Sequence, residues 1–235
     1  MLSGLEIKRQ VELGNIVISD FDEKRLNPNS YNIRLGKTLK VYEKGITPGE
    51  EIQKRIDKEM EPVRDEYIKI LETFKDEDSL TEDAQNERDS KINDIIYKSE
   101  EIRNRVLREY ALDPRKDNET IITEIPEEGY LLLPGILYLG ETKEYTETYG
   151  FIPNIDGRST TGRLGIEIHR TAGFGDNGFK GKWTLEITVT HPVIVYADME
   201  IGQLYYETID GDSSMKYNGK YQNQQGVEAA KVDRE

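Results

Sequence analysis

Apolar residues recur along this chain with two different periods, and the change of period divides the chain into zones. Over residues 118–210, apolar and polar residues alternate in short runs that Gly, Pro, Asn and Asp separate. This pattern is typical of β-strands at the spacing of a sandwich or a jelly-roll barrel. The strands predicted in this zone span residues 130–133, 135–141, 165–170, 183–190, 193–196 and 203–207.

The first zone, residues 1–45, extends the predicted β core. A short helix is expected at residues 5–13, a strand at 15–19, and an alternating strand at 30–35 that Gly36 closes. A helical zone separates these strands from those of residues 118–210. We therefore expect one mainly β domain, formed by residues 1–45 and 118–210, with the helical zone inserted between two early strands.

The inserted zone, residues 50–112, has apolar residues at every third or fourth position. That period predicts two long helices, joined by an acidic turn at residues 76–79, with Ser79 or Thr81 capping the second helix. The zone holds 19 Asp and Glu against 12 Lys and Arg, a net charge of −7. Two interpretations stay open: a solvated helical insertion, or a surface that binds a protein partner or another copy of the chain.

The C-terminal residues 211–235 lose the apolar pattern and become rich in Gly, Asn and Gln. A segment of this composition is usually disordered, so we expect a flexible tail. Its tyrosines and lysines would also suit a lid that becomes ordered over a ligand.

Bulk composition restricts the partners. The chain has 235 residues and a formal net charge of −14, which argues against a nucleic-acid backbone or an anionic membrane as a constant partner. Residues 1–30 contain no signal-peptide pattern, and no run approaches eighteen apolar residues. We therefore expect a soluble, cytoplasmic protein.

The chain contains no cysteine, and its only histidines are His169 and His191. Zinc-dependent nucleobase deaminases hold their metal with histidine and cysteine ligands. A protein of this composition that deaminates a base is therefore expected to do so without zinc.

Candidate chemistry concentrates between residues 156 and 186. A predicted turn presents the guanidinium groups of Arg158 and Arg163 with the hydroxyl groups of Ser159 and Thr160. Such groups suit phosphate oxygens, for which the fixed guanidinium fork is better shaped than lysine. Two carboxylates, Asp176 and Glu186, follow within about thirty residues. Phosphate donors followed by two carboxylates indicate a nucleotide site.

Several separated motifs in the same order resemble the dCTP deaminase branch of the trimeric dUTPase superfamily. The matching stretches are residues 21–23, 27–36, 157–186, 201–204 and 220–226, which leave the helical zone outside the resemblance. The resemblance implies a distorted jelly-roll or β-barrel fold, a homotrimer with shared sites, and dCTP or dUTP as substrate. The Ala172-Gly173-Phe174-Gly175-Asp176 run is closest to the bifunctional group that carries dCTP on to dUMP and diphosphate.

The same resemblance implies roles for four catalytic residues. Glu186 would shuttle protons during attack of water at C4 of cytosine, a role that suits a carboxylate in a partly buried site. Ser159 and Arg163 would hold the attacking water and the charge that develops at C4. Asp176 would contact the deoxyribose 3′-hydroxyl and orient the water that attacks the α-phosphorus.

Implied binding roles fall on seven further residues. Arg158 and Thr160 would contact phosphate oxygens, Ala172 and Thr184 would read the edge of the base, and the tail would close over the triphosphate through Tyr217, Lys220 and Gln224. Mg²⁺ bridging the phosphates is implied as well, since a triphosphate in so acidic a protein needs a counter-charge.

One departure from the family pattern is Asn32, which stands where the family usually has Asp and could loosen a structural hydrogen bond or a subunit contact. Two alternatives to a deaminase also stay open. The protein could be a dUTPase on a deaminase-like scaffold, or a non-catalytic nucleotide-binding protein whose helical zone binds a partner.

Overall fold

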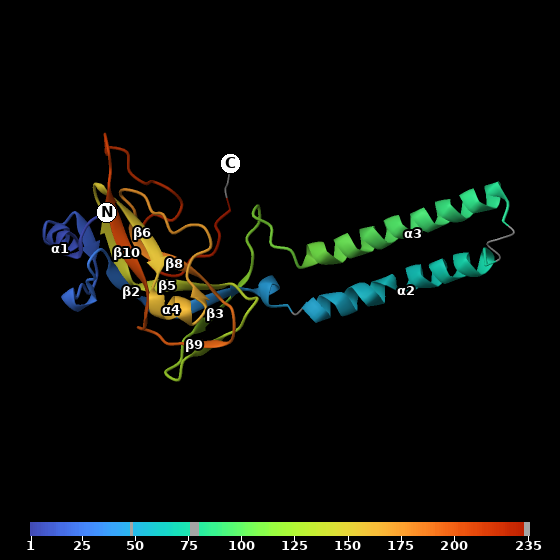
Figure 1. Ribbon diagram of the computed structural model, residues 1–235, viewed down its shortest axis with the longest axis horizontal. Coiled ribbons are helices and arrows are strands. Elements are labelled where there is room, and N and C mark those ends of the chain that lie inside the picture. The colour runs from blue at the N-terminus through green and yellow to red at the C-terminus, as the bar shows by residue number, and fades with distance from the viewer. Residues whose placement is uncertain (48, 76–79, 233–235) are drawn as a thin grey trace. The chain divides into compact units, whose positions relative to one another are not determined.

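The computed structural model describes residues 1–47, 49–75 and 80–232. The chain divides into two compact units. One unit comprises residues 1–45 and 113–235 and holds the strands, and the other comprises residues 46–112 and holds two long helices, α2 and α3 (Figure 1).

The first unit is built on an eight-stranded, barrel-like antiparallel sheet in which strands neighbour one another in the order β6-β10-β2-β5-β8-β7. Strand β1 adds to β5, and β3 adds to β2. Strands β4 and β9 form a separate pair. The strands are β1 Ile16–Ile18, β2 Tyr31–Tyr42, β3 Thr120–Glu124, β4 Tyr130–Leu132, β5 Tyr138–Thr148, β6 Phe151–Gly157, β7 Ile166–Glu167, β8 Lys180–Val189, β9 Val193–Val195 and β10 Glu200–Thr208.

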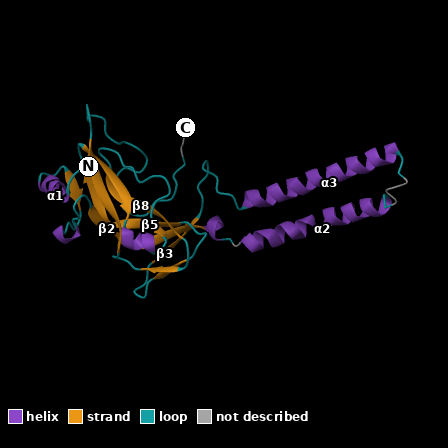
Figure 2. Ribbon diagram, viewed as in Figure 1, coloured by secondary structure: helices purple, strands orange, loops and turns teal. Residues whose placement is uncertain are grey.

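Short helices accompany this sheet. They are α1 Gly4–Glu12, α4 Ser159–Arg163, and the 3-10 turns Glu23–Arg25 and Glu43–Ile46 (Figure 2). The helix expected at residues 5–13 is therefore present with its boundaries moved by one residue. It starts where the Ser3 hydroxyl accepts a hydrogen bond from the Glu6 amide, as an N-cap residue does.

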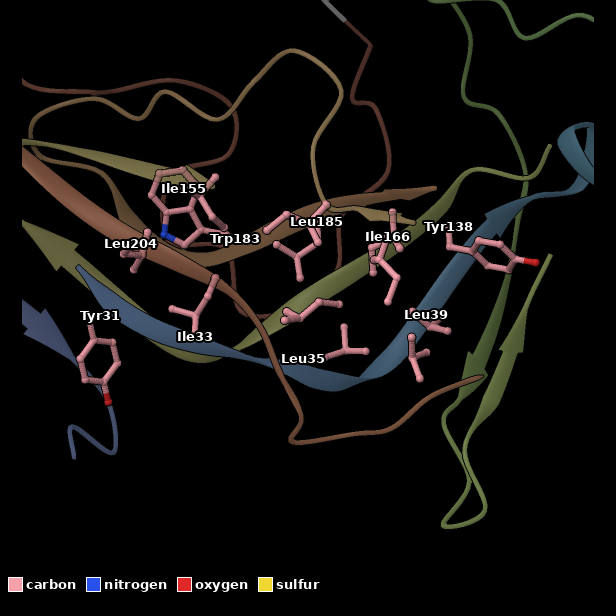
Figure 3. Close-up of a cluster of buried hydrophobic side chains, with 14 of the residues drawn as sticks. Tyr31, Ile33, Leu35, Leu39, Tyr138, Ile155, Ile166, Trp183, Leu185 and Leu204 are labelled. Carbon is pink, nitrogen blue, oxygen red and sulfur yellow. The ribbon is translucent and has the colours of Figure 1, made fainter. Parts of the chain in front are cut away.

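The core of this unit lies between facing strands. Side chains of β2 and β8 meet there, with Ile33, Leu35, Leu185 and Ile187 completely buried. Figure 3 shows Ile33, Leu35, Leu185 and Trp183 directed into the same space between the strands. Successive side chains of a strand point to opposite faces, so each of these strands presents its alternate residues away from this core.

Two strands that the apolar pattern did not predict are β3 and β6. Strand β6 carries Pro153, and a proline argues against a strand in the middle of a sheet because it cannot donate a ladder hydrogen bond. The strand order places β6 at one end of the sheet path, where it pairs with β10. Pro153 is tolerated there because β6 forms ladder hydrogen bonds with one neighbouring strand, β10.

The second unit consists of α2, Gly49–Thr73, and α3, Glu82–Glu109. Val63 and Ile70 of α2 are buried against Ile95 of α3, with Phe74, Ile92 and Ile102 packed around them. On one side of this contact, ion pairs join the helices: Glu66 with Lys98, Glu59 with Arg105, and Arg55 with Glu109. The two predicted long helices are therefore confirmed, and they pack side by side.

The start of α3 decides between the two predicted caps. Thr81 is the N-cap residue, since its hydroxyl accepts a hydrogen bond from the Ala84 amide at 3.3 Å. Ser79, the other candidate, and the acidic turn at residues 76–79 lie outside the described residues. Across the described ranges, neither long helix is apolar enough over its length to cross a bilayer.

Prediction: replacing residues 46–112 by a short Gly-Ser linker leaves the β unit folded. The chain leaves and re-enters that unit on paired strands, where Tyr42 is opposite Thr120 and the Glu43 amide donates to the Glu119 carbonyl at 3.0 Å. We expect circular dichroism of the shortened chain to lose helical signal and to show one cooperative thermal transition of the remaining β structure. An unfolded shortened chain would contradict the division into two units.

Candidate active site

One hollow of the β unit has a volume of about 320 Å³. Strands β5 and β8 form its floor, the loop of residues 172–179 forms one wall, and the C-terminal tail forms another. Leu137, Leu139, Phe174, Phe179 and Trp183 make much of its lining apolar or aromatic. A concave, largely apolar hollow with a few polar groups is the usual form of a small-molecule site.

Strand β8 supplies the polar groups of this hollow. Lys182, Thr184 and Glu186 line it, and they alternate with the buried Leu185 and Ile187. The prediction that Glu186 faces away from its apolar neighbours is therefore confirmed. The Arg170 amide donates a hydrogen bond to Oε2 of Glu186 at 2.8 Å, which fixes the orientation of the carboxylate.

Lys182 brings a positive charge into the hollow. Its ammonium group lies 3.4 Å from Oε2 of Glu141, and the Glu141 side chain is only 7% exposed. The buried carboxylate therefore holds the lysine against the floor of the hollow. A cation at this point suits an anionic ligand.

The loop after β7 carries two of the predicted residues, Ala172 and Asp176, to the wall of the hollow. Backbone hydrogen bonds tie it to β6, from the Ile155 amide to the Gly173 carbonyl at 2.7 Å and from the Gly175 amide to the Pro153 carbonyl at 2.8 Å. A Cβ at Gly175 would lie 2.4 Å from the Trp183 ring, so no side chain fits there. Asp176, one residue on, is exposed.

The C-terminal tail is packed along β8 as far as the structure describes it. The Gln224 side-chain amide donates to the Lys182 carbonyl at 3.0 Å and to the Thr184 hydroxyl at 2.7 Å. Gly181 allows this approach: its φ is +148°, and a Cβ there would lie 2.9 Å from the Gln224 carbonyl oxygen. Gln224 therefore attaches the tail to the floor strand, and its amide hydrogens are directed at protein groups.

A second attachment holds the earlier part of the tail. The side-chain amide of Asn177 donates to the carbonyl groups of Ser213 and Met215 at 2.9 and 3.0 Å. Tyr217 follows, with its ring centroid 5.8 Å from that of Phe179. Tyr217 and Gln224 thus both line the hollow, whereas Lys220 lies outside it and donates to the Lys231 carbonyl at 2.8 Å.

The predicted turn of hydroxyl and guanidinium groups forms α4, away from this hollow. Ser159, Thr160 and Arg163 are exposed, and Arg158 forms an ion pair with Glu200. A single chain therefore brings together six of the predicted residues, namely Ala172, Asp176, Thr184, Glu186, Tyr217 and Gln224. It does not bring the four residues of the α4 turn, or Lys220, to the same place.

Comparison with known families decides the relationship. The family model described as "dCTP deaminase-like" matches residues 1–80 and 91–209. The chain belongs to the dCTP deaminase-like family. The predicted resemblance is thereby confirmed, and the matched ranges include most of the helical zone, which the motifs had left outside.

Relatives of the same family are 38% identical to the chain. Proteins named "dCTP deaminase, dUMP-forming" from Leptospira biflexa and Clostridium beijerinckii match over 228 residues each, covering 97% of this chain and 93% and 94% of theirs. Among solved structures, the 2′-deoxycytidine 5′-triphosphate deaminase from Agrobacterium tumefaciens matches with a TM-score of 0.49 and 14% identity. That match covers 88% of this chain and 48% of the Agrobacterium chain.

Lys182 is the residue of this deaminase-like site that sequence reasoning missed. The sequence does contain a signal for Lys182, because a strand that directs Glu186 and Thr184 into a site directs every second residue the same way. Among the described residues, no group of three or more His, Cys, Asp and Glu side chains could hold a metal ion.

Prediction: Gln224→Ala releases the tail of this deaminase-like protein. The substitution removes two hydrogen bonds between the tail and β8 at a side chain that is 6% exposed, a loss of about 1–3 kcal/mol. Limited proteolysis should then cut the segment of residues 209–232 faster than in the wild-type protein. The neighbouring Gln225→Ala, at an exposed position, is the control and should leave the cleavage rate unchanged.

Proposed function

We propose that the protein converts dCTP to dUMP in two hydrolytic steps. The observation that carries the proposal is the Glu186 carboxylate, held by a backbone amide at the floor of an apolar hollow in a member of the dCTP deaminase-like family. Relatives that match nearly the whole chain are named for the same conversion. The reaction belongs to pyrimidine deoxynucleotide metabolism.

In the first step, Glu186 takes a proton from water as that water attacks C4 of the cytosine ring. The proton passes to N3, and a tetrahedral carbon bearing the hydroxyl and the amine results. Glu186 then removes the hydroxyl proton and delivers it to the amine, so that ammonia leaves and dUTP remains. One carboxylate serves both transfers because it returns to its ionised form.

The second step breaks the bond between the α-phosphorus and the bridging oxygen of dUTP. Asp176 orients a water for attack on the α-phosphorus and contacts the 3′-hydroxyl of the sugar, and dUMP and diphosphate are released. Lys182 offers its charge to the phosphates from the floor strand. Ala172 and Thr184 line the same hollow as Glu186 and would contact the edge of the base.

The α4 turn enters this proposal from a neighbouring copy. Its Ser159 and Arg163 are exposed and absent from the hollow of their own chain, yet the proposed chemistry needs donors at C4 and at the phosphates. In a homotrimer, closed cyclic symmetry would give every hollow one such turn. Arg158, Thr160, Tyr217, Lys220 and Gln224 would then surround the triphosphate.

Mg²⁺ enters as the counter-ion of the triphosphate. Among the described residues, no group of three or more carboxylate and imidazole side chains is placed to hold a metal ion. The phosphate oxygens would therefore be its main ligands, and it would supply positive charge to the leaving diphosphate. The chain's own Lys182 and the arginines of α4 would bind the remaining phosphate oxygens.

Prediction: Glu186→Gln lowers ammonia release from dCTP by about 10²–10⁴-fold while dCTP binding stays nearly unchanged, because the amide fills the same space but cannot carry the proton. Ammonia and nucleotide products are measured with dCTP and Mg²⁺. Asp176→Asn is the comparison: it should still release ammonia but accumulate dUTP. Glu207→Gln, a strand glutamate outside the hollow, should match the wild-type protein. Loss of dUMP formation in the wild-type protein, or full activity of Glu186→Gln, would refute the proposal.

Prediction: two inactive variants restore activity when they share an assembly. Glu186→Gln and Arg163→Ala should each be inactive, but co-expression gives some hollows a wild-type Glu186 facing a wild-type α4 turn. Random assortment predicts recovery of up to about a quarter of the wild-type rate. Mixing the two purified variants without exchange of subunits is the control. No recovery in verified mixed assemblies would place the whole site in one chain.

A further inference from the structure

A closed circuit of side-chain hydrogen bonds fixes the two residues that precede α4. It begins at the Gly157 carbonyl, which accepts from the Gln203 side-chain amide at 3.0 Å. Oε1 of Gln203 accepts from the Ser30 hydroxyl at 2.7 Å. Ser30 in turn accepts from the side-chain amide of Asn27 at 3.2 Å.

The circuit returns through β2 and β10. Asn27 also donates to Oδ1 of Asn32 at 2.7 Å, and the amide nitrogen of Asn32 donates to Oε2 of Glu200 at 3.1 Å. The same oxygen of Glu200 accepts from Nη1 of Arg158. The path therefore ends at Arg158, directly after Gly157 where it began, and the peptide bond between these two residues closes the circuit.

Buried polar groups make this circuit specific. Ser30 and Asn32 are only 7% and 8% exposed, so each polar atom needs a partner inside the protein. A carboxylate can only accept hydrogen bonds, which fixes the orientation of the Asn32 amide: its nitrogen faces Glu200 and its oxygen faces Asn27. A carboxylate at position 32 would place two acceptors against each other.

Glu200 is the charged member at which the circuit meets Arg158. Strand β10 also holds α4 directly, since the hydroxyl of the buried Thr161 lies 3.1 Å from the Ile201 carbonyl. The carboxylate and the helix anchor are therefore adjacent on one strand. A guanidinium has five N–H donors, so an ion pair through Nη1 leaves donors for a ligand.

We propose that Glu200 is a positioning residue for phosphate binding: through Arg158 and Asn32 it sets the guanidinium and the start of α4 in the orientation that meets the triphosphate. This inference rests on the proposed function, in which the α4 turn binds the nucleotide. It adds that Asn32 is required in this chain because the carboxylate of the circuit belongs to β10. The departure at position 32 is therefore matched to Glu200.

The experiment exchanges the amide at position 32 and the carboxylate at position 200. Asn32→Asp sets two carboxylates against each other and displaces Arg158, so the KM for dCTP should rise by about tenfold with a smaller change in kcat. The double variant Asn32→Asp with Glu200→Gln replaces the contact between two acceptors by a hydrogen bond from the new amide nitrogen at position 200 to the new carboxylate at position 32, and the amide oxygen beside that nitrogen is the acceptor left for Arg158. Its KM should return to within about threefold of the wild-type value.

Controls separate positioning from stability and from the proposed function. Thermal unfolding of each variant, and Glu207→Gln on the same strand, show whether KM follows stability. Glu200→Gln alone should raise KM less than Asn32→Asp, because it keeps a hydrogen bond to Arg158. If the wild-type protein is active but the exchange gives no rescue, or if only the melting temperature changes, the role of Glu200 is overturned. The proposed function is then unaffected. A wild-type protein that neither binds nor turns over dCTP overturns both proposals.

Discussion

The structure depends on one strand that meets two environments. Trp183, Leu185, Ile187 and Val189 of β8 are buried in the barrel core, and Lys182, Thr184 and Glu186, which alternate with them, line the hollow. Because side chains alternate strictly along a strand, the burial of Leu185 and Ile187 fixes the direction of Glu186 between them. A shift of one residue in register would place the carboxylate in the core and a leucine in the site. The packing of the barrel thus sets the position of the proposed catalytic group.

The C-terminal tail is bound to the same strand, β8. Its backbone pairs with β8 at Gly181, where the Lys182 amide donates to the Gln224 carbonyl at 2.9 Å and the Gln224 side chain reaches Thr184. The groups that close the hollow are therefore bonded to the strand that forms its floor. Any ligand that enters must be accommodated between two segments that share hydrogen bonds, which links tail opening to access. The Thr184 hydroxyl also accepts from the Glu228 amide at 3.2 Å, so the link continues along the tail.

Sequence reasoning succeeded where one residue's neighbours determine its environment. Alternation around Glu186 indicated its face, and the helical period of the inserted zone indicated two packed helices. It failed where distant partners decide the outcome. Strand β6 was missed because Pro153 is acceptable only at an edge, and the edge is a property of the whole sheet. The circuit from Asn27 to Glu200 joins residues more than 160 positions apart, and no local pattern reveals it. Which predicted site residues share a hollow likewise required the fold.

Charge supports the proposal that the hollow of one chain receives further groups from a neighbouring copy. The protein has a net charge of −14, and the one lysine at the floor of the hollow, as far as the described residues line it, already lies 3.4 Å from the buried Glu141. A triphosphate placed there would face Asp176 and Glu228 as well, so binding needs further cations. Two sources of charge are consistent with the structure: a divalent ion carried by the phosphates, and the exposed arginine of α4 from another copy. Because Arg158 is held by Glu200, its position would be set before the proposed substrate arrives, which would lower the entropic cost of binding.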